Sequence, residues 1–288
     1  MLNLHHTLYA AAWAGRTQGR PLSQKLPHPL TAPFTPEERV VWDQAVQYYD
    51  AQIASRDLLS GRGMENIKSA LVSGNLDNPA IEKQLRATLE AARPVFHRYF
   101  WPEQDRTNRA WIASITERVK TIAPEVIPRL EKTYEAKWFS TPVRADAVWV
   151  GNWAGAYTTV NPPHSTISST DPVDQDWSGA ETVFHELSHV LVRTLWRKLG
   201  AALGEAEKQH GDLWHAIQFY LVGAVVREAL AGRKIDYNPT VYALGLYERG
   251  TWAAYRKPIE EIWGPYLQGR YSMDEAIART VNAVATPK

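Results

Sequence analysis

The chain has 288 residues, of which 44% are hydrophobic and 22% charged, so it is long enough for one large domain or two small ones with a real core. Its 32 lysines and arginines nearly balance 31 aspartates and glutamates, and this net charge of +1 argues against a nucleic-acid partner. The absence of cysteine excludes disulfides, thiolate zinc sites and cysteine nucleophiles. No apolar run has the length of a membrane span.

The N-terminal stretch 1–15 lacks the basic start and the clean apolar core of a secretory signal, so we expect it to be the first structured segment. The sequence is compatible with a cytoplasmic protein and with an exported one whose signal peptide has been removed. The proline-rich stretch 16–34 then predicts an extended segment.

Helices are predicted over most of the first half of the chain. Thr35, Pro36 and Glu38 form a capping-box pattern that opens a helix over 35–60. Further helices are expected over 64–73, ending at Gly74, over 78–100, and over 105–137 with a break at the prolines 124 and 128. The sequence therefore predicts a helical N-terminal subdomain over 1–140.

The second half begins with β-like segments. Residues 147–150 and 156–160 suggest a β-hairpin, and the polar stretch 164–170 suggests an edge strand. A helix is expected over 178–199, opened by a capping box of Ser178 and Glu181 and ended by Gly200. A polar loop, a strongly apolar helix over 212–231, a tyrosine-rich loop and one or two closing helices follow. The predicted fold class is α+β, mainly α, with a catalytic subdomain over 141–288.

One pentapeptide in the expected helix carries a pattern with chemical meaning. It reads His185-Glu186-Leu187-Ser188-His189. Two histidines four residues apart lie about 40° apart around a helix and about 6 Å apart along it, so both imidazoles can reach one metal ion. Imidazole is a good zinc ligand, and the intervening carboxylate can take a proton from a zinc-bound water. The residues thus predict a zinc hydrolase, against the simpler interpretation of two surface histidines with a glutamate between them.

With this signature the chain resembles the zincin metallopeptidases, over about 160–230. The resemblance implies that His185 and His189 bind zinc and that Glu186 is the general base. It also implies a zincin-like catalytic half in which the substrate backbone pairs with the edge strand before the motif helix, here 164–170.

A catalytic zinc needs a third protein ligand. Metzincins place a third histidine shortly after the motif, and this chain lacks it. Thermolysin-like gluzincins place a glutamate about twenty residues on, where this chain has Glu207 and His210 in the polar loop. Neurolysin-type oligopeptidases use about 25 residues, and that spacing points to His215, at the start of the apolar helix. We expect His215 to replace the usual glutamate, with His210 and Glu207 as alternatives and a core histidine beside Trp214 as the simpler interpretation.

Zinc hydrolases also need a hydrogen-bond donor for the oxyanion of the attacked carbonyl. Tyr237, Tyr242 and Tyr247 lie in the loop after the apolar helix, and Tyr242 is the chosen candidate. His164 is a candidate for the rim of the site.

Together these residues predict a zinc-dependent metallopeptidase that acts on a peptide or protein substrate. Two alternatives remain open at this point. One is a non-catalytic zinc-binding or scaffold protein, and the other is a zinc hydrolase acting on a non-peptide amide or ester.

Overall fold

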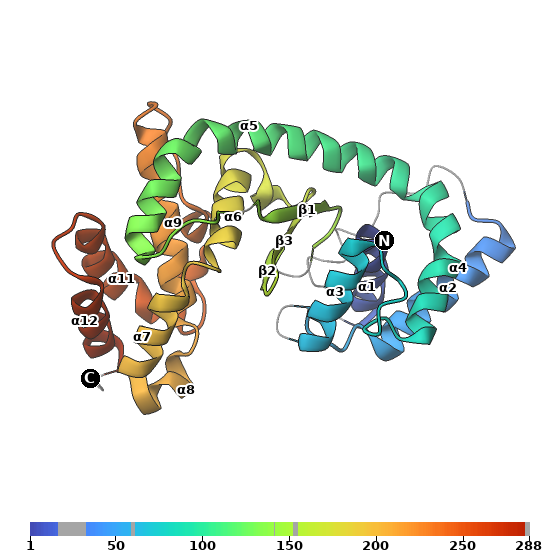
Figure 1. Cartoon of the computed structure of the whole chain (residues 1–288), viewed down its shortest axis with the longest axis horizontal. Helices are drawn as coiled ribbons and strands as arrows, with labels where there is room; N and C mark the ends of the chain where they lie inside the picture. Colours follow the sequence, from blue (N-terminus) through green and yellow to red (C-terminus); the bar gives the residue numbers. More distant parts are fainter. Residues whose placement is uncertain (17–32, 59–60, 141, 152–154, 286–288) are drawn as a thin grey trace. The chain divides into compact units, whose positions relative to one another are not determined.

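The computed structural model describes residues 1–16, 33–58, 61–140, 142–151 and 155–285. Within these residues the chain is mostly helical and carries one three-stranded sheet, as Figure 1 shows, so the predicted class of α+β, mainly α, is confirmed. The extended segment predicted over 16–34 lies almost wholly outside the described residues. None of the described helices has both the length and the hydropathy needed to span a membrane.

The chain folds into two compact units built from separate stretches of sequence. Unit 1 comprises Met1–Ser114 and Arg144–Gln175, and unit 2 comprises Ile115–Val143 and Asp176–Lys288. The predicted boundary near residue 140 does not coincide with this division, because the strands after it belong with the N-terminal helices. The sheet and the motif helix, which the zincin resemblance assigns to one half, therefore fall in different units.

Unit 1 holds the first helices, and their ends follow the predicted signals. Thr35 caps the second helix, its hydroxyl accepts from the Glu38 amide, and the Glu38 side chain reaches back, so the capping box is confirmed. Gly74 ends the third helix at φ 71°, a left-handed conformation that glycine adopts without a Cβ clash. The helices are α1 (Leu2–Arg16), α2 (Pro36–Gln52), α3 (Arg62–Ser73), α4 (Lys83–Tyr99), the start of α5 (Trp101–Tyr134) and the short 3₁₀ helix η2 (Pro172–Asp174).

The sheet consists of β1 (Arg144–Val148), β2 (Ala156–Val160) and β3 (Pro163–Ser168), in the order β1-β3-β2. β3 pairs parallel with β1 and antiparallel with β2. Two predictions are therefore wrong: β1 and β2 do not form a hairpin with each other, and the stretch at 164–170 is the central strand and not an edge. Most polar side chains of β3 find internal partners and can therefore be buried: the Ser165 and Thr158 hydroxyls lie 2.8 Å apart, and the Ser168 hydroxyl donates to the Trp149 carbonyl.

Polar side chains from the N-terminal helices tie the sheet into unit 1. The Asn3 amide donates to the Ala147 carbonyl at 3.3 Å, and His6 Nδ1 lies 2.8 Å from the Gly151 carbonyl. The buried Lys68 ammonium donates to the backbone carbonyl of His164 at 2.9 Å. These contacts join residues about 100 positions apart or more, so no local sequence signal announces them.

Helix α5 continues through Pro124 and Pro128, where a break was predicted. A proline in a helix removes one N–H and frees the carbonyl four residues earlier. Both prolines are exposed, so water can satisfy the freed carbonyls, and the buried positions 122, 126 and 130 keep the helix packed on the core of unit 2.

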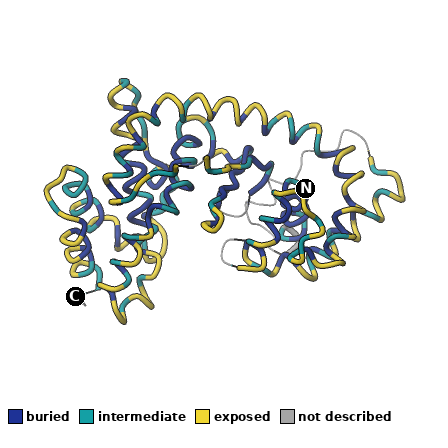
Figure 2. Tube along the Cα trace, viewed as in Figure 1, coloured by how far each residue is buried: buried dark blue, intermediate teal, exposed yellow. Residues whose placement is uncertain are grey.

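The core of unit 2 is centred on one apolar helix, α9 (Leu213–Ala231), which matches the prediction over 212–231 closely. It packs against α6, α7 and α11 (Figure 1) and is buried along most of its length, as Figure 2 shows for the tube. The other elements of the unit are α6 (Asp176–Ser188), α7 (Arg193–Leu203), η3 (Gly204–Ala206), α8 (Glu207–His210), α10 (Thr240–Ala243), η4 (Leu246–Glu248), α11 (Trp252–Leu267) and α12 (Met273–Ala285).

The single helix predicted over 178–199 is two helices, with a tight turn between Ser188 and Arg193. The proposed capping box is also wrong, because α6 already begins at Asp176. Glu181 lies within α6, and its buried carboxylate accepts from the Tyr237 hydroxyl at 2.7 Å and from the Thr240 amide. Gly200 lies inside α7, where a Cβ would come within 2.8 Å of Glu207.

Candidate metal centre

Three imidazoles converge in unit 2. The ligand atoms of His185, His189 and His215 all lie within 4.8 Å of one another, and His185 Nε2 is 3.2 Å from His215 Nε2. His185 is in the last turn of α6, His189 follows directly after that helix, and His215 is in the first turn of α9. The structure thus brings together the three histidines singled out as metal ligands.

The end of α6 sets the relation between the two motif histidines. The His189 amide donates to the Glu186 carbonyl, three residues back, and the Val190 amide donates to the Leu187 carbonyl in the same way. The helix therefore tightens into a 3₁₀-like turn at the motif. His185 and His189 still have ring centroids 5.0 Å apart, with the rings nearly perpendicular.

Aromatic rings surround the cluster. Phe219 lies 3.9 Å from the His185 ring, Trp214 stacks on His215 at 5.0 Å, and Trp252 meets His215 edge-on at 5.9 Å. The Trp252 indole N–H donates to Asp212, the residue before α9, at 2.7 Å, which fixes that ring. These side chains keep water away from the imidazoles on several sides.

Burial is the main reason why all three imidazoles are neutral at neutral pH. Desolvation lowers the pKa of His189 to about 3 and that of His215 to about 4, and it lowers the pKa of His185 well below its usual value. Neutral imidazole is the form that binds a metal ion.

The donor set fits a zinc ion. Tetrahedral zinc with Zn–N distances of about 2.0–2.1 Å separates its ligand nitrogens by about 3.3 Å, and the two Nε2 atoms of His185 and His215 are 3.2 Å apart. A hydrogen bond between two neutral imidazoles gives a similar distance. Metal analysis of the purified protein therefore distinguishes a metal-binding cluster from one held by a hydrogen bond alone.

The Glu186 carboxylate lies close to His189 and outside the group that the three histidine nitrogens form. Its side chain is 7% exposed, and Oε2 is 4.0 Å from His189 Nε2. At this distance the Glu186 carboxylate is not one of the grouped ligand atoms. It is near enough to exchange a proton with a molecule held between it and the histidines.

The tyrosines of the loop after α9 all have partners other than the histidines. The hydroxyl of Tyr242 donates to Glu260 at 2.9 Å, and that of Tyr247 donates to the Ala216 carbonyl. Two aromatic rings, Tyr247 and Trp252, stand in the chain of ring contacts between Tyr242 and His215. These contacts do not favour Tyr242 as the oxyanion donor.

The alternative ligands are held elsewhere. His210 Nδ1 lies 2.9 Å from the Tyr255 hydroxyl, and the Glu207 carboxylate lies over Gly200. His164 belongs to β3 in unit 1, where its Nε2 is 2.7 Å from Asp146. Hydrogen bonding to His164 and Arg144 lowers the pKa of Asp146 to about 2, against a burial that raises it.

Sequence reasoning gave no role to two residues at the motif: Ser188, which belongs to it, and Gln218, which contacts it from α9. Both are fully buried, and Gln218 Nε2 donates to the His185 carbonyl at 3.0 Å and to the Ser188 hydroxyl at 2.8 Å. A signal was available, because Gln218 is a polar residue with apolar neighbours on both sides in α9.

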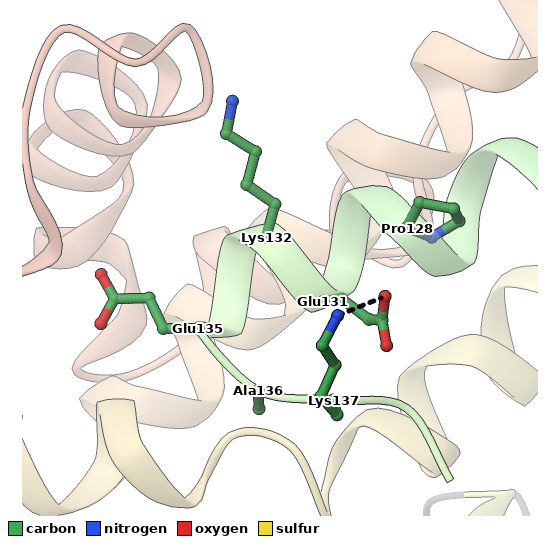
Figure 3. Close-up of a pocket in the computed structure, with 6 residues that line it drawn as sticks. All are labelled: Pro128, Glu131, Lys132, Glu135, Ala136 and Lys137. Atoms are coloured by element: carbon green, nitrogen blue, oxygen red, sulfur yellow. Dashed lines mark ion pairs between the residues drawn. The ribbon is translucent and has the colours of Figure 1, made fainter. Parts of the chain in front are cut away.

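A hollow at the end of α5 is a separate feature of unit 2. It is lined by charged and small side chains, with an ion pair between Glu131 and Lys137 at 3.8 Å, as Figure 3 shows. Lys132 extends upward and Glu135 to the left in Figure 3, and none of the three histidines lines the hollow. The hollow therefore adds nothing to the candidate metal site formed by the three histidines.

Comparison of the chain with models of known protein families, with curated proteins and with solved structures gives no match.

Proposed function

We propose that this chain is a zinc-dependent metallopeptidase whose metal is held by His185, His189 and His215. The observation that carries the proposal is the convergence of three neutral, desolvated imidazoles beside a buried carboxylate, Glu186. The zincin-like character of the catalytic half is part of this proposal, and it rests on the His-Glu-x-x-His motif and not on the sheet, which belongs to unit 1.

The roles follow from the positions of the side chains. Bound zinc would act as a Lewis acid that activates water and polarises a carbonyl. Glu186, 4.0 Å from His189 Nε2, accepts the proton of the attacking water and later returns it to the leaving amine. The rings of Trp214 and Phe219 exclude water around the histidines and so keep them in the unprotonated form. The predicted pairing of substrate with 164–170 is not part of the proposal, because the backbone of β3 is paired on both sides.

The test separates the base from the ligands. Glu186→Gln is expected to retain about one zinc per chain and to lose peptide hydrolysis by roughly 10²–10⁴-fold, because only the proton transfer is removed. Metal analysis of the purified protein and digestion of a peptide library measure the two quantities. Glu181→Gln is the matched control, since Glu181 is buried in the same helix and its carboxylate is bound to Tyr237 and Thr240.

Two outcomes would replace this proposal by another. Hydrolysis at the wild-type rate in Glu186→Gln would refute the role of the base. A structural zinc site would be favoured if the zinc-loaded wild type cleaves no peptide and unfolds when the metal is removed. If the protein cleaves only esters or non-peptide amides, the same chemistry acts on a different substrate.

A further inference from the structure

The carbonyl of His185 has lost its normal helical partner. In an α-helix it would accept from the amide of residue 189, but the His189 amide donates to the Glu186 carbonyl because α6 tightens at its end. The His185 carbonyl is buried with its residue and accepts from two side chains, the Ser188 hydroxyl at 2.8 Å and the Gln218 amide at 3.0 Å. These two side chains therefore cap the helix at the motif.

One amide group connects the two helices that carry the histidines. Gln218 lies three residues after His215, on the same face of α9, and both hydrogens of its amide nitrogen are used, on the His185 carbonyl and on the Ser188 hydroxyl. The Ser188 hydroxyl can accept this bond because its own hydrogen goes to the His185 carbonyl. This three-way network fixes the position of α6 along α9, and with it the distance between His185 and His215.

The usual way to orient a ligand histidine is not used at His185. A ligand imidazole commonly donates its second nitrogen to a carboxylate or a carbonyl, yet His185 Nδ1 is buried and has no hydrogen-bond partner within the described parts of the chain. The His185 ring contacts Phe219 at 3.9 Å, and Gln218 and Ser188 donate to the backbone carbonyl of His185 and not to its ring. Backbone capping thus takes the place of a direct hydrogen bond to the ring.

We propose that Gln218, together with Ser188, is a positioning residue that holds the three histidines at metal-binding spacing and so sets the affinity of the site. This inference rests on the proposed metal site. It concerns how the ligands are held and is independent of which substrate is hydrolysed.

The experiment measures Co²⁺ binding to the full chain by its visible absorption, in competition with a chelator. Gln218→Met keeps the length of the side chain and removes the amide, and Ser188→Ala removes one hydroxyl. In each variant we expect the Co²⁺ affinity to fall by about 10- to 100-fold, the range typical for loss of a group that orients a ligand. The absorption bands should also change, because the ligand geometry changes. Ser188→Thr, which retains a hydroxyl, is expected to restore part of the affinity.

A control separates positioning from general stability. Thr280 is equally buried in unit 2, where its hydroxyl accepts from the Trp263 indole at 3.0 Å and donates to the Ala276 carbonyl. Thr280→Val should therefore lower the free energy of unfolding of the metal-free protein and leave the Co²⁺ affinity and spectrum unchanged.

The outcomes distinguish this inference from the proposed function. Wild-type affinity and spectrum in folded Ser188→Ala and Gln218→Met would overturn the positioning role, even in an active peptidase; if Gln218→Met does not fold, Ser188→Ala decides alone. If the wild type cleaves no peptide and the variants bind Co²⁺ more weakly than it does, the positioning role is supported and the proposed peptidase function is refuted. A wild type that binds neither Co²⁺ nor Zn²⁺ would overturn both.

Discussion

Glu181 provides a prediction that depends on the fold of unit 2 alone. Its side chain lies one turn before His185 in α6 and is 1% exposed. Its carboxylate accepts from the Tyr237 hydroxyl at 2.7 Å and from the Thr240 amide at 3.2 Å. Both bonds favour the charged form, but burial outweighs them and raises the pKa of Glu181 from 4.5 to about 7.

The sign and size of the effect on stability follow from linkage. Between pH 4.5 and 7 the folded protein holds a proton that the unfolded chain has released, so this group's contribution to stability is full below pH 4.5 and is lost as the pH rises through 7. A difference of about 2.5 pKa units corresponds to roughly 3 kcal/mol at 1.36 kcal/mol per unit. Glu181→Gln removes the titration and keeps the shape of the side chain.

The assay compares urea unfolding of the metal-free wild type and Glu181→Gln at a series of pH values from 4 to 8. The free energy of unfolding of the wild type, relative to that of the variant, should fall by roughly 3 kcal/mol over this range. The buried histidines titrate in both proteins, so their contribution cancels in the difference. A difference that stays constant with pH would refute the reasoning, because it would mean that Glu181 ionises normally in the folded protein.

Two further predictions concern the proposed third metal ligand in unit 2 and a buried lysine in unit 1. His215→Ala should abolish tight zinc binding, whereas His210→Ala should retain about one zinc per folded chain because His210 is bound to a tyrosine. Metal stoichiometry measures both, and the reverse result would move the third ligand to the loop. Lys68→Met should lower the free energy of unfolding by about 1–2 kcal/mol, since it removes a buried donor from the His164 carbonyl and a cation from the Tyr157 face. Urea unfolding measures this free energy, and an unchanged or raised stability would contradict the prediction.

Local signals in the sequence were sufficient for several parts of this structure. The capping box at Thr35 and Glu38 and the left-handed Gly74 depend on residues a few positions apart, and both are confirmed. The apolar run 213–231 is long enough to identify a buried helix, so His215 could be placed in its first turn. The spacing of His185 and His189 predicted that two imidazoles could meet, and the zincin resemblance pointed to His215 as the third; the structure brings all three together.

The features that sequence reasoning missed depend on contacts between distant residues. The order of the strands is fixed by side chains such as Lys68, which is 96 positions from its partner on β3. The polar residues of β3 suggested an exposed edge because their internal hydrogen-bond partners could not be seen. Similarly, Glu181 matched a capping box by spacing, but its partners lie 56 and 59 positions away. Pro124 and Pro128 were expected to break α5 because a proline leaves a helical carbonyl without a partner. Both prolines are exposed, so water can bind the freed carbonyls and the helix continues.

The cost of the histidine cluster supports a ligand in this part of the fold. Each buried polar group without a partner costs about 1–3 kcal/mol, and His185 Nδ1 and Gln218 Oε1 are two such atoms at the same helix contact. One 3.2 Å contact between imidazoles returns only part of that cost. Apolar side chains at positions 185 and 218 would avoid the cost of these unpartnered atoms. Places where a chain departs from good packing in this way are typically those that serve function, and here two such atoms lie where α6 and α9, the helices whose histidines would bind the metal, meet.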